Sequence, residues 1–296
     1  MQPTALVIGR TGQLARELAR TTSPFAATFV GREGADLTRP QEAAALVERT
    51  RPALVVIAAA YTAVDKAESE PETARLVNTE APGAVATACA RVGAALVHVS
   101  TDLVFGGAKD GAYVETDAPA PLGVYGRTKM DGEARVLGAG ARAAVVRTSW
   151  VFGPLGANFL HMVLKLAGAG EMRIVDDQVG RPTAGGDLAR AVWALGERLV
   201  DGAAEAEGLF HYAGADDAIR ADQAQAIVDA AVARGGPAAR VIRVPTSAFP
   251  TPARRPLNAR LDSGRINALG IPSRPWREAV EQAVDEVLAV RAGEVA

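Results

Sequence analysis

The sequence predicts an α/β fold, in which a doubly wound parallel sheet is followed by a smaller C-terminal lobe. Short runs of Val, Ile, Leu and Ala without polar alternation are typical of parallel strands that are covered on both faces. Alanine-rich stretches of helical length lie between these runs, and this alternation favours right-handed crossovers within one sheet. After about Val175 the alternation loosens and Pro and Gly gather, which indicates a change of architecture.

The first part of the chain holds six apolar runs that we expect to form strands. They cover residues 5–8, 27–30, 54–58, 95–99, 144–147 and 173–175. Helical segments accompany them at residues 12–21, 41–50, 71–92, 125–137 and 158–167. The alanine bias of these segments agrees with the high helix propensity of alanine.

The second part of the chain is less regular. Pro and Gly cluster at residues 180–182 and 249–256, and helices are expected near residues 184–200, 221–233 and 276–290. We therefore divide the chain into a sheet domain at residues 1–175 and a smaller lobe that takes up most of residues 176–296. This division leaves room for segments of the second part to return to the sheet domain.

Composition and charge exclude several classes of function. Hydrophobic residues make up 49% of the 296-residue chain, which is enough for a large core. The net charge of −2 gives no electrostatic basis for binding nucleic acid or an anionic membrane surface. No apolar run reaches the roughly 18 residues that a membrane span needs, and no basic segment precedes residues 4–8 as in a signal peptide. We therefore expect a cytoplasmic protein.

Cysteine and histidine offer little chemistry in this chain. Cys89 is the only cysteine, which rules out an intramolecular disulfide and a cysteine-based zinc site. The three histidines, His98, His161 and His211, are scattered along the chain, and we interpret all of them as structural. We predict no metal ligands.

The turn after the first predicted strand has the pattern of a dinucleotide-binding loop. Gly9 permits a tight turn, and Gly12 lets backbone N–H groups approach a pyrophosphate at the start of the next helix. Ala15 stands where a third glycine is common and where alanine is tolerated. A glycine pair alone is weak evidence, and the alternative is an ordinary strand-to-helix turn. The position at the first such turn of an α/β chain favours dinucleotide binding.

The end of the second predicted strand bears on the choice between NADPH and NADH. A carboxylate there would bind the adenosine ribose, but the strand end at Gly31 provides none. Arg32, and Arg10 in the glycine loop, can instead bind a 2′-phosphate, so we expect NADPH to be preferred over NADH. The alternative for either arginine is a solvated surface cation. Asp36 would either bind the adenine or cap the helix after Pro40.

Three residues form a candidate apparatus for carbonyl reduction. Thr101 ends a predicted strand, at the sheet edge where ligands bind. Tyr125 and Lys129 are four residues apart, so a helix places both on one face. Individually each has a simple alternative: a strand-end cap for Thr101, a helix-start aromatic for Tyr125 and a solvated charge for Lys129. Their occurrence together behind a nucleotide loop favours catalysis.

The expected chemistry depends on the pKa of Tyr125. A free tyrosine has a pKa of about 10, which makes it a poor acid–base group at neutrality. One positive charge at ~4 Å favours the phenolate by about 4 kcal/mol, or about three pKa units, at an effective dielectric of about 20. We therefore expect Lys129, together with an oxidised nicotinamide, to hold that pKa down. Thr101 would hydrogen-bond and orient the substrate oxygen, and the cofactor supplies the hydride.

Seven segments together resemble the dTDP-4-dehydrorhamnose reductase family, a group of extended short-chain dehydrogenases/reductases. They are residues 9–14 (GRTGQL), 62–68 (TAVDKAE), 100–102 (STD), 125–129 (YGRTK), 147–153 (RTSWVFG), 177–182 (DQVGRP) and 250–256 (PTPARRP). The last four are more specific than a Tyr-x-x-x-Lys pair, and the resemblance runs from Gly9 to about Trp276.

The resemblance implies a Rossmann-like fold with a C-terminal substrate-binding lobe. It implies NADPH- or NADH-dependent reduction of the 4-keto group of dTDP-4-dehydro-6-deoxy-L-mannose to dTDP-L-rhamnose. The partner it implies is thus a small-molecule dTDP-sugar, and a homodimer is left open. Tyr125 would be the proton donor, Lys129 its partner and a contact of the nicotinamide ribose, and Thr101 and Asp102 would lie at the reacting sugar.

Further binding residues are also implied by the resemblance. The cofactor contacts are Gly12, Gln13 and Leu14 at the pyrophosphate, Asp36 and Leu37 on the adenine side, and Ala59, Ala60 and Tyr61 in the crevice. The substrate contacts are Trp150 against the nucleotide-sugar, with Asn158 and Arg254 at its diphosphate or nucleotide. Arginine suits this task because its planar fork binds phosphate bidentately. The alternatives are core packing for Trp150 and a loop salt bridge for Arg254.

The chain departs from the family pattern at a few positions. Ile57 replaces a common asparagine, Leu103 a usual tyrosine and Tyr61 a common histidine. Some family members bind Mg²⁺ between subunits through glutamates, and Glu17 matches one such position. One carboxylate does not assign a metal, so Mg²⁺ is not part of the prediction.

Two other functions stay open. A sister ketoreductase would make a different dTDP-deoxysugar, such as a streptose-type or antibiotic sugar. A non-catalytic regulatory subunit of this fold would bind NADP without turnover, but the intact set of Thr101, Tyr125 and Lys129 argues against it. A dehydratase is disfavoured because Leu103, rather than an acidic residue, follows Asp102.

Overall fold

Six parallel strands form one central sheet in the computed structural model, which describes residues 2–292. The strands are β1 (Thr4–Ile8), β2 (Ala26–Val30), β3 (Leu54–Ile57), β4 (Ala95–Thr101), β5 (Ala143–Thr148) and β10 (Gly208–His211). Their order is β10-β5-β4-β3-β1-β2, and every neighbouring pair is parallel. The chain moves outward from β1 to β2 and then returns past β1 to β3. The carboxyl ends of β1 and β3 therefore flank the switch point where ligands bind in such sheets.

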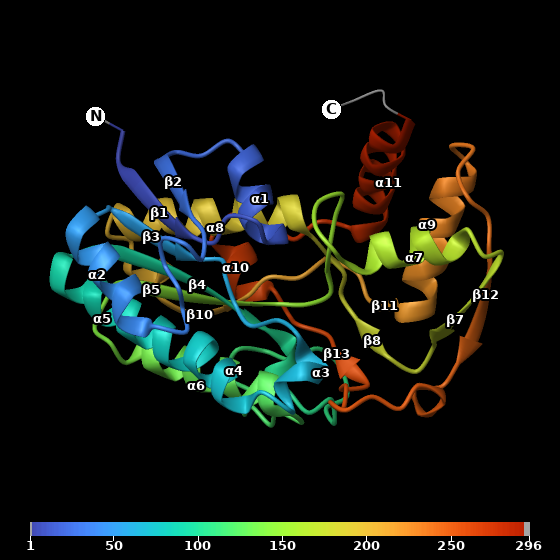
Figure 1. Ribbon diagram of the computed structural model, residues 1–296, viewed down its shortest axis with the longest axis horizontal. Coiled ribbons are helices and arrows are strands. Elements are labelled where there is room, and N and C mark those ends of the chain that lie inside the picture. Colours follow the sequence, from blue (N-terminus) through green and yellow to red (C-terminus); the bar gives the residue numbers. More distant parts are fainter. Residues whose placement is uncertain (1, 293–296) are drawn as a thin grey trace.

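Helices cover both faces of this sheet, as predicted (Figure 1). One face carries α1 (Gln13–Arg20), α8 (Gly185–Val200) and α10 (Gly264–Ala268), and the other carries α2 (Pro40–Thr50), α5 (Ala81–Val92) and α6 (Val124–Leu137). Along β4, Val97 packs toward α8 while Leu96 packs toward α5, because successive side chains of a strand point to opposite faces. In residues 2–292 no helix combines the length and the apolar character that a membrane crossing requires.

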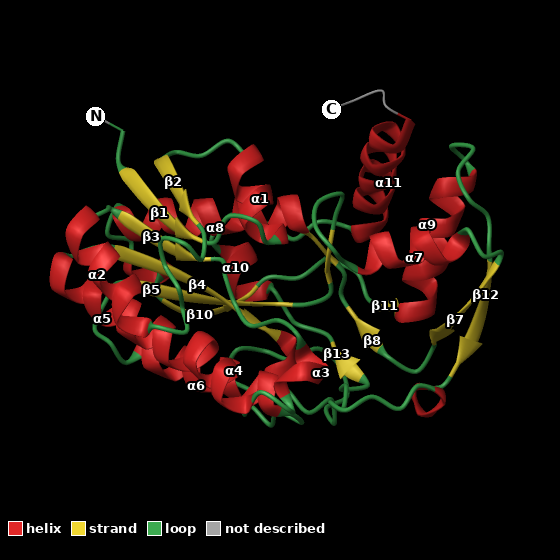
Figure 2. Cartoon of the chain, in the orientation of Figure 1, coloured by secondary structure: helices red, strands yellow, loops and turns green. Residues whose placement is uncertain are grey.

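A second hydrophobic core lies in the smaller lobe, beside the sheet domain in Figure 2. Its helices are α7 (Phe159–Ala167), α9 (Arg220–Val232) and α11 (Trp276–Ala292). Its strands are β6 (Val151–Phe152), β7 (Glu171–Val175), β8 (Val179–Gly180), β9 (Thr183–Ala184), β11 (Ala218–Ile219), β12 (Arg240–Val244) and β13 (Asn258–Ala259). Trp276, the first residue of α11, is fully buried in this core.

The chain crosses between the two parts more than once. The predicted strand at residues 173–175 exists as β7, but it pairs with β12 in a separate two-stranded sheet. Conversely, β10 and α8 follow residue 175 in sequence and belong to the central sheet and its covering layer. β10 and α8 are therefore segments of the second part that return to the sheet domain. The division at residue 175 stays a prediction.

The predicted helix at residues 71–92 is one helical run with a local change of winding. It consists of α4 (Pro71–Arg75), the π-helical segment η1 (Leu76–Glu80) and α5. Short helical elements that were not predicted are α3 (Val64–Ala67), α10 and the 3₁₀ turns η2 (Asp102–Val104), η3 (Ala204–Ala206) and η4 (Thr246–Ala248). π-helical turns are rare and are frequent at functional sites.

Candidate functional site

A cleft of about 960 Å³ opens at the carboxyl ends of β1, β3 and β4. This volume is in the range of small-molecule and cofactor sites. Most of the predicted site residues line it: Gly9, Arg10, Gly12, Gln13, Leu14, Arg32, Asp36, Leu37, Ala59, Ala60, Tyr61, Thr101, Asp102, Tyr125, Lys129 and Trp150. The fold thus brings the glycine loop and the candidate catalytic residues to one crevice.

The glycine loop is shaped for close approach by a ligand. Gly9 has φ +132°, which an L side chain rarely adopts, and its N–H donates to the carbonyl of Val30 at 2.8 Å. Gly12 is the N-cap of α1, where no side chain caps the helix, and a Cβ there would point into open space. The free N–H groups of the first turn of α1 can therefore bind an anion.

The two arginines near the loop make exposed ion pairs. Arg10 pairs with Glu33 at 2.8 Å, and Arg32 pairs with Asp36 at 3.3 Å. Such exposed pairs contribute little, so both guanidinium groups stay available to a phosphate. Asp36 also accepts hydrogen bonds from the backbone N–H and the hydroxyl of Thr38, at 2.9 and 2.8 Å. These bonds, with Arg32, lower the pKa of Asp36. They close the turn at residues 36–38, whereas the N-cap of α2 is Arg39 and no side chain caps that helix.

The start of α6 places Tyr125 beside Thr101. The N–H of Val124 donates to the carboxylate of Glu68 at 2.8 Å, which caps the helix from across the chain. Gly126 lies so close to Leu103 of η2 that a Cβ would overlap the carbonyl oxygen of Leu103. The hydroxyl of Thr101 donates to Asp102 at 2.9 Å and accepts from the N–H of Leu103 at 3.2 Å. Packing between α6 and η2 therefore determines how close the phenol of Tyr125 lies to Thr101 at the end of β4.

The pKa of Tyr125 is dominated by the burial of its phenol. Burial raises the pKa of Tyr125 to about 12, the charge of Asp102 adds to this, and a hydrogen bond with Thr101 opposes it. Desolvation dominates this pKa in the protein chain by itself. The expectation that Lys129 and an oxidised nicotinamide together hold the pKa down stays a prediction. A phenol with a raised pKa is fully protonated at neutral pH, which is the form that a proton donor needs.

Lys129 is buried beneath the cleft and is held by two acceptors. Its Nζ donates to the carbonyl oxygen of Val99 at 2.8 Å and lies 3.2 Å from Nε2 of His98. Burial lowers the pKa of Lys129 to about 8, and the charge of Glu133 opposes that shift. The contact with His98 was missed by sequence reasoning, because it joins β4 to α6 across the fold.

A buried ion pair joins α6, the helix that carries Tyr125 and Lys129, to the central sheet. Arg147 of β5 donates from Nε and Nη2 to the carboxylate of Glu133 on α6, with the shortest contact at 2.6 Å. The hydroxyl of Ser100 also donates to Glu133. The pair ties α6 to the two strands beneath it, and a buried ion pair of this kind is tolerated because both partners are hydrogen-bonded.

Asn78 of η1 holds the crevice loop and was not predicted. Its Oδ1 accepts from the N–H of Tyr61 at 2.9 Å, while its Nδ2 donates to the carbonyl of Tyr61 at 3.1 Å and to Thr128 at 3.2 Å. The residue is fully buried, so all these groups are paired inside the protein. The only sequence signal was a polar residue within an apolar helical stretch.

Trp150 forms part of the cleft wall on the side of the lobe. Its φ is +47°, which is unusual for a bulky residue, and a Cβ at Gly180 would clash with its ring. The guanidinium carbon of Arg220 lies 3.4 Å from the centre of that ring. Trp150 is therefore held in place at the cleft surface, and Arg220, at the start of α9, is a neighbour that sequence reasoning missed.

Asp102 is a buried carboxylate at the junction of the two parts. Its Oδ2 accepts from the hydroxyl of Ser149 at 3.2 Å. Burial raises the pKa of Asp102 to about 6, against the hydrogen bonds from Thr101 and Ser149 and the charge of Arg220. This carboxyl group, with a pKa well above its ordinary value of 3.8, lines the cleft together with Tyr125 and Lys129.

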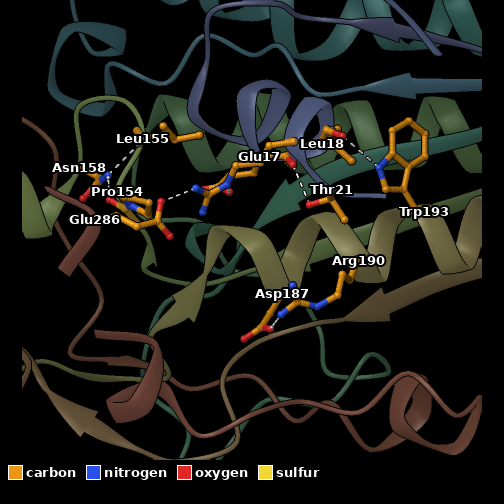
Figure 3. Close-up of polar contacts among 12 residues, drawn as sticks. Glu17, Leu18, Thr21, Pro154, Leu155, Asn158, Asp187, Arg190, Trp193 and Glu286 are labelled. Atoms are coloured by element: carbon orange, nitrogen blue, oxygen red, sulfur yellow. Dashed lines mark hydrogen bonds and ion pairs between the residues drawn. The ribbon is translucent and has the colours of Figure 1, made fainter. Parts of the chain in front are cut away.

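Two of the predicted substrate residues do not line the cleft. The amide of Asn158 accepts from the N–H of Leu160 at 3.0 Å and donates to the carbonyl of Gly153 at 2.9 Å. It also donates to the carbonyl of Leu155 at 3.2 Å (Figure 3). It caps α7 and closes the loop before it. Arg254 is exposed outside the cleft, and its neighbour Arg255 pairs with Asp65 at 3.0 Å. Contacts of Asn158 and Arg254 with a substrate stay predictions.

Glu17, the carboxylate that the family resemblance connects with Mg²⁺, does not present a metal site. It is fully buried on α1, and its Oε2 accepts from Nε of Arg20 at 2.6 Å. Arg20 also pairs with Glu286 of α11 (Figure 3). Nowhere in residues 2–292 are three or more His, Cys, Asp or Glu side chains grouped to hold a metal ion. Mg²⁺ takes several oxygen ligands, and Glu17 by itself supplies one carboxylate.

Comparisons with known proteins agree with this geometry. A family profile described as the RmlD substrate binding domain matches residues 3–289. The chain is 42% identical over 294 residues to a dTDP-4-dehydrorhamnose reductase of Burkholderia thailandensis, covering 96% of this chain and 99% of that protein. It is 38% identical over 302 residues to a dTDP-4-dehydrorhamnose reductase of Escherichia coli, covering 97% and 99%. A crystal structure of dTDP-4-dehydrorhamnose reductase from Bacillus anthracis in complex with NADP has a TM-score of 0.89 at 30% identity, over 97% of this chain and all of that one.

Proposed function

The chain belongs to the dTDP-4-dehydrorhamnose reductase family, and we propose that it reduces the 4-keto group of dTDP-4-dehydro-6-deoxy-L-mannose to dTDP-L-rhamnose with NADPH. The observation that carries the proposal is the placement of Thr101, Tyr125 and Lys129 in one cleft with the glycine loop. A nucleotide loop alone would fit a binding protein. A buried phenol and ammonium beside that loop fit a carbonyl reductase.

The residues of the cleft fit a dinucleotide with an added phosphate. The unpaired N–H groups at the start of α1 suit the pyrophosphate, because Gly12 leaves the approach open. Arg32 and Arg10 are exposed at the far end of the cleft and would bind the 2′-phosphate that distinguishes NADPH from NADH. When bound, NADPH supplies the hydride that adds to the carbonyl carbon.

The chain's own residues supply the proton and the orientation. Tyr125 donates its phenolic proton to the carbonyl oxygen of the sugar, which becomes the new hydroxyl group. The ammonium of Lys129, buried in the same site, stabilises the phenolate that remains. The hydroxyl of Thr101 lies beside the phenol and orients the oxygen that receives the proton.

The lobe would supply the contacts to the nucleotide-sugar. Trp150 offers an aromatic surface in the cleft wall, backed by Arg220. Asn158 and Arg254 remain predicted contacts to the diphosphate or nucleotide. The cytoplasmic setting and the homodimer also stay predictions.

Product analysis tests the proposal. Purified protein is given NADPH and the keto-sugar formed in situ by a 4,6-dehydratase and a 3,5-epimerase, and the product is identified by NMR. The proposal expects NADPH oxidation that requires the epimerase and yields dTDP-L-rhamnose. Turnover without the epimerase, or to another sugar, would instead indicate that the protein is a sister ketoreductase. Binding of NADPH without any turnover would indicate a regulatory role.

A further inference from the structure

We propose that His98 is a positioning residue for Lys129. As a neutral imidazole it accepts a hydrogen bond from the ammonium group and directs the remaining N–H of Lys129 into the cleft. The inference rests on the proposed function, in which Lys129 is catalytic. The imidazole of His98 is a buried titratable group that does not itself take part in the proposed reduction.

The geometry at Nζ of Lys129 accounts for all three of its protons. A lysine ammonium has three donors and no acceptor. One donor is directed to the carbonyl oxygen of Val99 at 2.8 Å and a second to Nε2 of His98 at 3.2 Å. Lys129 also lines the cleft, so the third donor is the one that faces a ligand. Two fixed acceptors below the side chain therefore determine the direction of the third N–H above it.

The other nitrogen of His98 indicates why a histidine stands here. If Nε2 accepts from Lys129, the ring proton must be on Nδ1. His98 is fully buried, and its Nδ1 has no hydrogen-bond partner within the described part of the chain. An unpaired buried N–H is unfavourable, and an apolar side chain at this position would avoid it. The hydrogen bond to Lys129 is the one interaction of His98 that an apolar residue cannot replace.

The surroundings keep His98 neutral. Burial, followed by the charge of Lys129, lowers its pKa well below the usual value. Its side chain extends from β4 toward α6, where the charged groups are Lys129 and Glu133, and Glu133 is already bound by Arg147 of β5. Tyr125, the other buried titratable residue of α6, is protonated at neutral pH, whereas Arg127 and Asp131 are exposed. An imidazolium would repel Lys129, so the acceptor role requires the neutral ring.

Two substitutions of similar size distinguish the loss of the hydrogen-bond acceptor at His98 from a change in packing. His98→Gln keeps an acceptor oxygen near the place of Nε2, whereas His98→Leu keeps the volume and removes the acceptor. Loss of a hydrogen bond to a charged group should lower kcat of His98→Leu by about 10- to 100-fold, with KM for the sugar within about twofold. The alkaline limb of the pH–rate profile should also move to lower pH, because the ammonium loses an acceptor. His98→Gln should restore both properties. Equal kcat and pH limbs in wild type and His98→Leu would overturn the inference.

The tautomer of His98 can be measured in the wild-type protein and does not depend on how any variant folds. Nitrogen-15 NMR of the imidazole groups should show His98 with its proton on Nδ1. His161 is an internal control, because its Nε2 lies 2.9 Å from the carbonyl of Pro154 and should carry the proton. A proton on Nε2 of His98, or an imidazolium at neutral pH, would overturn the inference.

Titration of Lys129 by NMR separates this inference from the proposed function. The chain has four lysines, at positions 66, 109, 129 and 165, so the signal can be assigned with one substitution. The pKa of Lys129 should be lower in His98→Leu than in wild type and should recover in His98→Gln. An unchanged pKa in His98→Leu would contradict the positioning role even if the enzyme is active. Absence of turnover by the wild type would instead reject the proposed function. The titration would still show whether His98 accepts a hydrogen bond from Lys129.

Discussion

Gly126 of α6 packs directly on the carbonyl oxygen of Leu103, and a Cβ at Gly126 would overlap that oxygen. The contact brings the first turn of α6 against the turn that follows Thr101 and Asp102. It therefore sets how closely the phenol of Tyr125 approaches Thr101.

Replacing Gly126 with alanine should separate these two elements. Because the added methyl group meets backbone rather than a flexible side chain, we expect Gly126→Ala to reduce the free energy of unfolding by about 1–3 kcal/mol. The displaced phenol should also reduce kcat more than it weakens NADPH binding. Urea unfolding and steady-state kinetics measure both effects. Gly168→Ala is a matched control, because a Cβ there makes only an ordinary contact at 3.5 Å and should leave both properties unchanged. Equal behaviour of the two variants would show that the close approach is not needed.

The buried pair of Glu133 and Arg147 should be intolerant of losing one charge. Glu133→Gln leaves the guanidinium of Arg147 buried without a counter-charge, which should cost about 3–5 kcal/mol of stability in urea unfolding. The exposed pair of Glu48 and Arg91 provides the comparison, since Glu48→Gln should change stability by no more than about 0.5 kcal/mol. A loss below about 1 kcal/mol in Glu133→Gln would mean that water or repacking compensates for the lost carboxylate.

Asp102 should make wild-type stability fall as pH rises. Its folded pKa of about 6 lies above its ordinary value of 3.8, so between these values the native state binds more protons than the unfolded state. Stability is therefore lost through this window, by about 3 kcal/mol for about two pKa units. Asp102→Asn removes the titration, so its stability relative to wild type should rise by that amount between about pH 4 and about pH 8. Stability curves of the two proteins that run parallel across this range would contradict the assignment.

Arg32 should distinguish the two nicotinamide cofactors. Its guanidinium is mostly exposed, and among residues 2–292 only Asp36, at 3.3 Å, holds it, so it can turn to a 2′-phosphate. Arg32→Ala should weaken NADPH binding several-fold and leave NADH binding almost unchanged, as measured by fluorescence titration. Arg39→Ala, which removes another exposed arginine beside Asp36, is the control for general charge effects. Equal losses for NADPH and NADH in Arg32→Ala would reject the 2′-phosphate role.

Local patterns in the sequence predicted five of the six strands of the central sheet. The apolar runs at β1, β3 and β4 and the turn at Gly9 depend on neighbouring residues, and their order in the chain determines a parallel, doubly wound sheet. The strand β10 is only four residues long and lies after the lobe has begun, so no local signal marks it as part of the central sheet. The edge of that sheet was therefore not predicted.

The candidate site was predictable to the extent that its residues are close in sequence. Tyr125 and Lys129 share a helix, and their common cleft followed from their spacing. The contacts of His98 with Lys129 and of Asn78 with Tyr61 join separate elements, and the π-helical turn that carries Asn78 has no periodicity of its own. The pKa of Tyr125 could not be derived from spacing, because burial, which dominates it, is a property of the whole fold.

Turnover by Tyr125→Phe tests the central claim most directly. The variant removes only the phenolic hydroxyl, and wild type and variant are compared for oxidation of NADPH by the dTDP-4-keto sugar and for NADPH affinity. If Tyr125 donates the proton, kcat should fall by at least about 100-fold while the dissociation constant of NADPH stays within about twofold. Turnover close to wild type in Tyr125→Phe would contradict the account, because the proton would then come from another group.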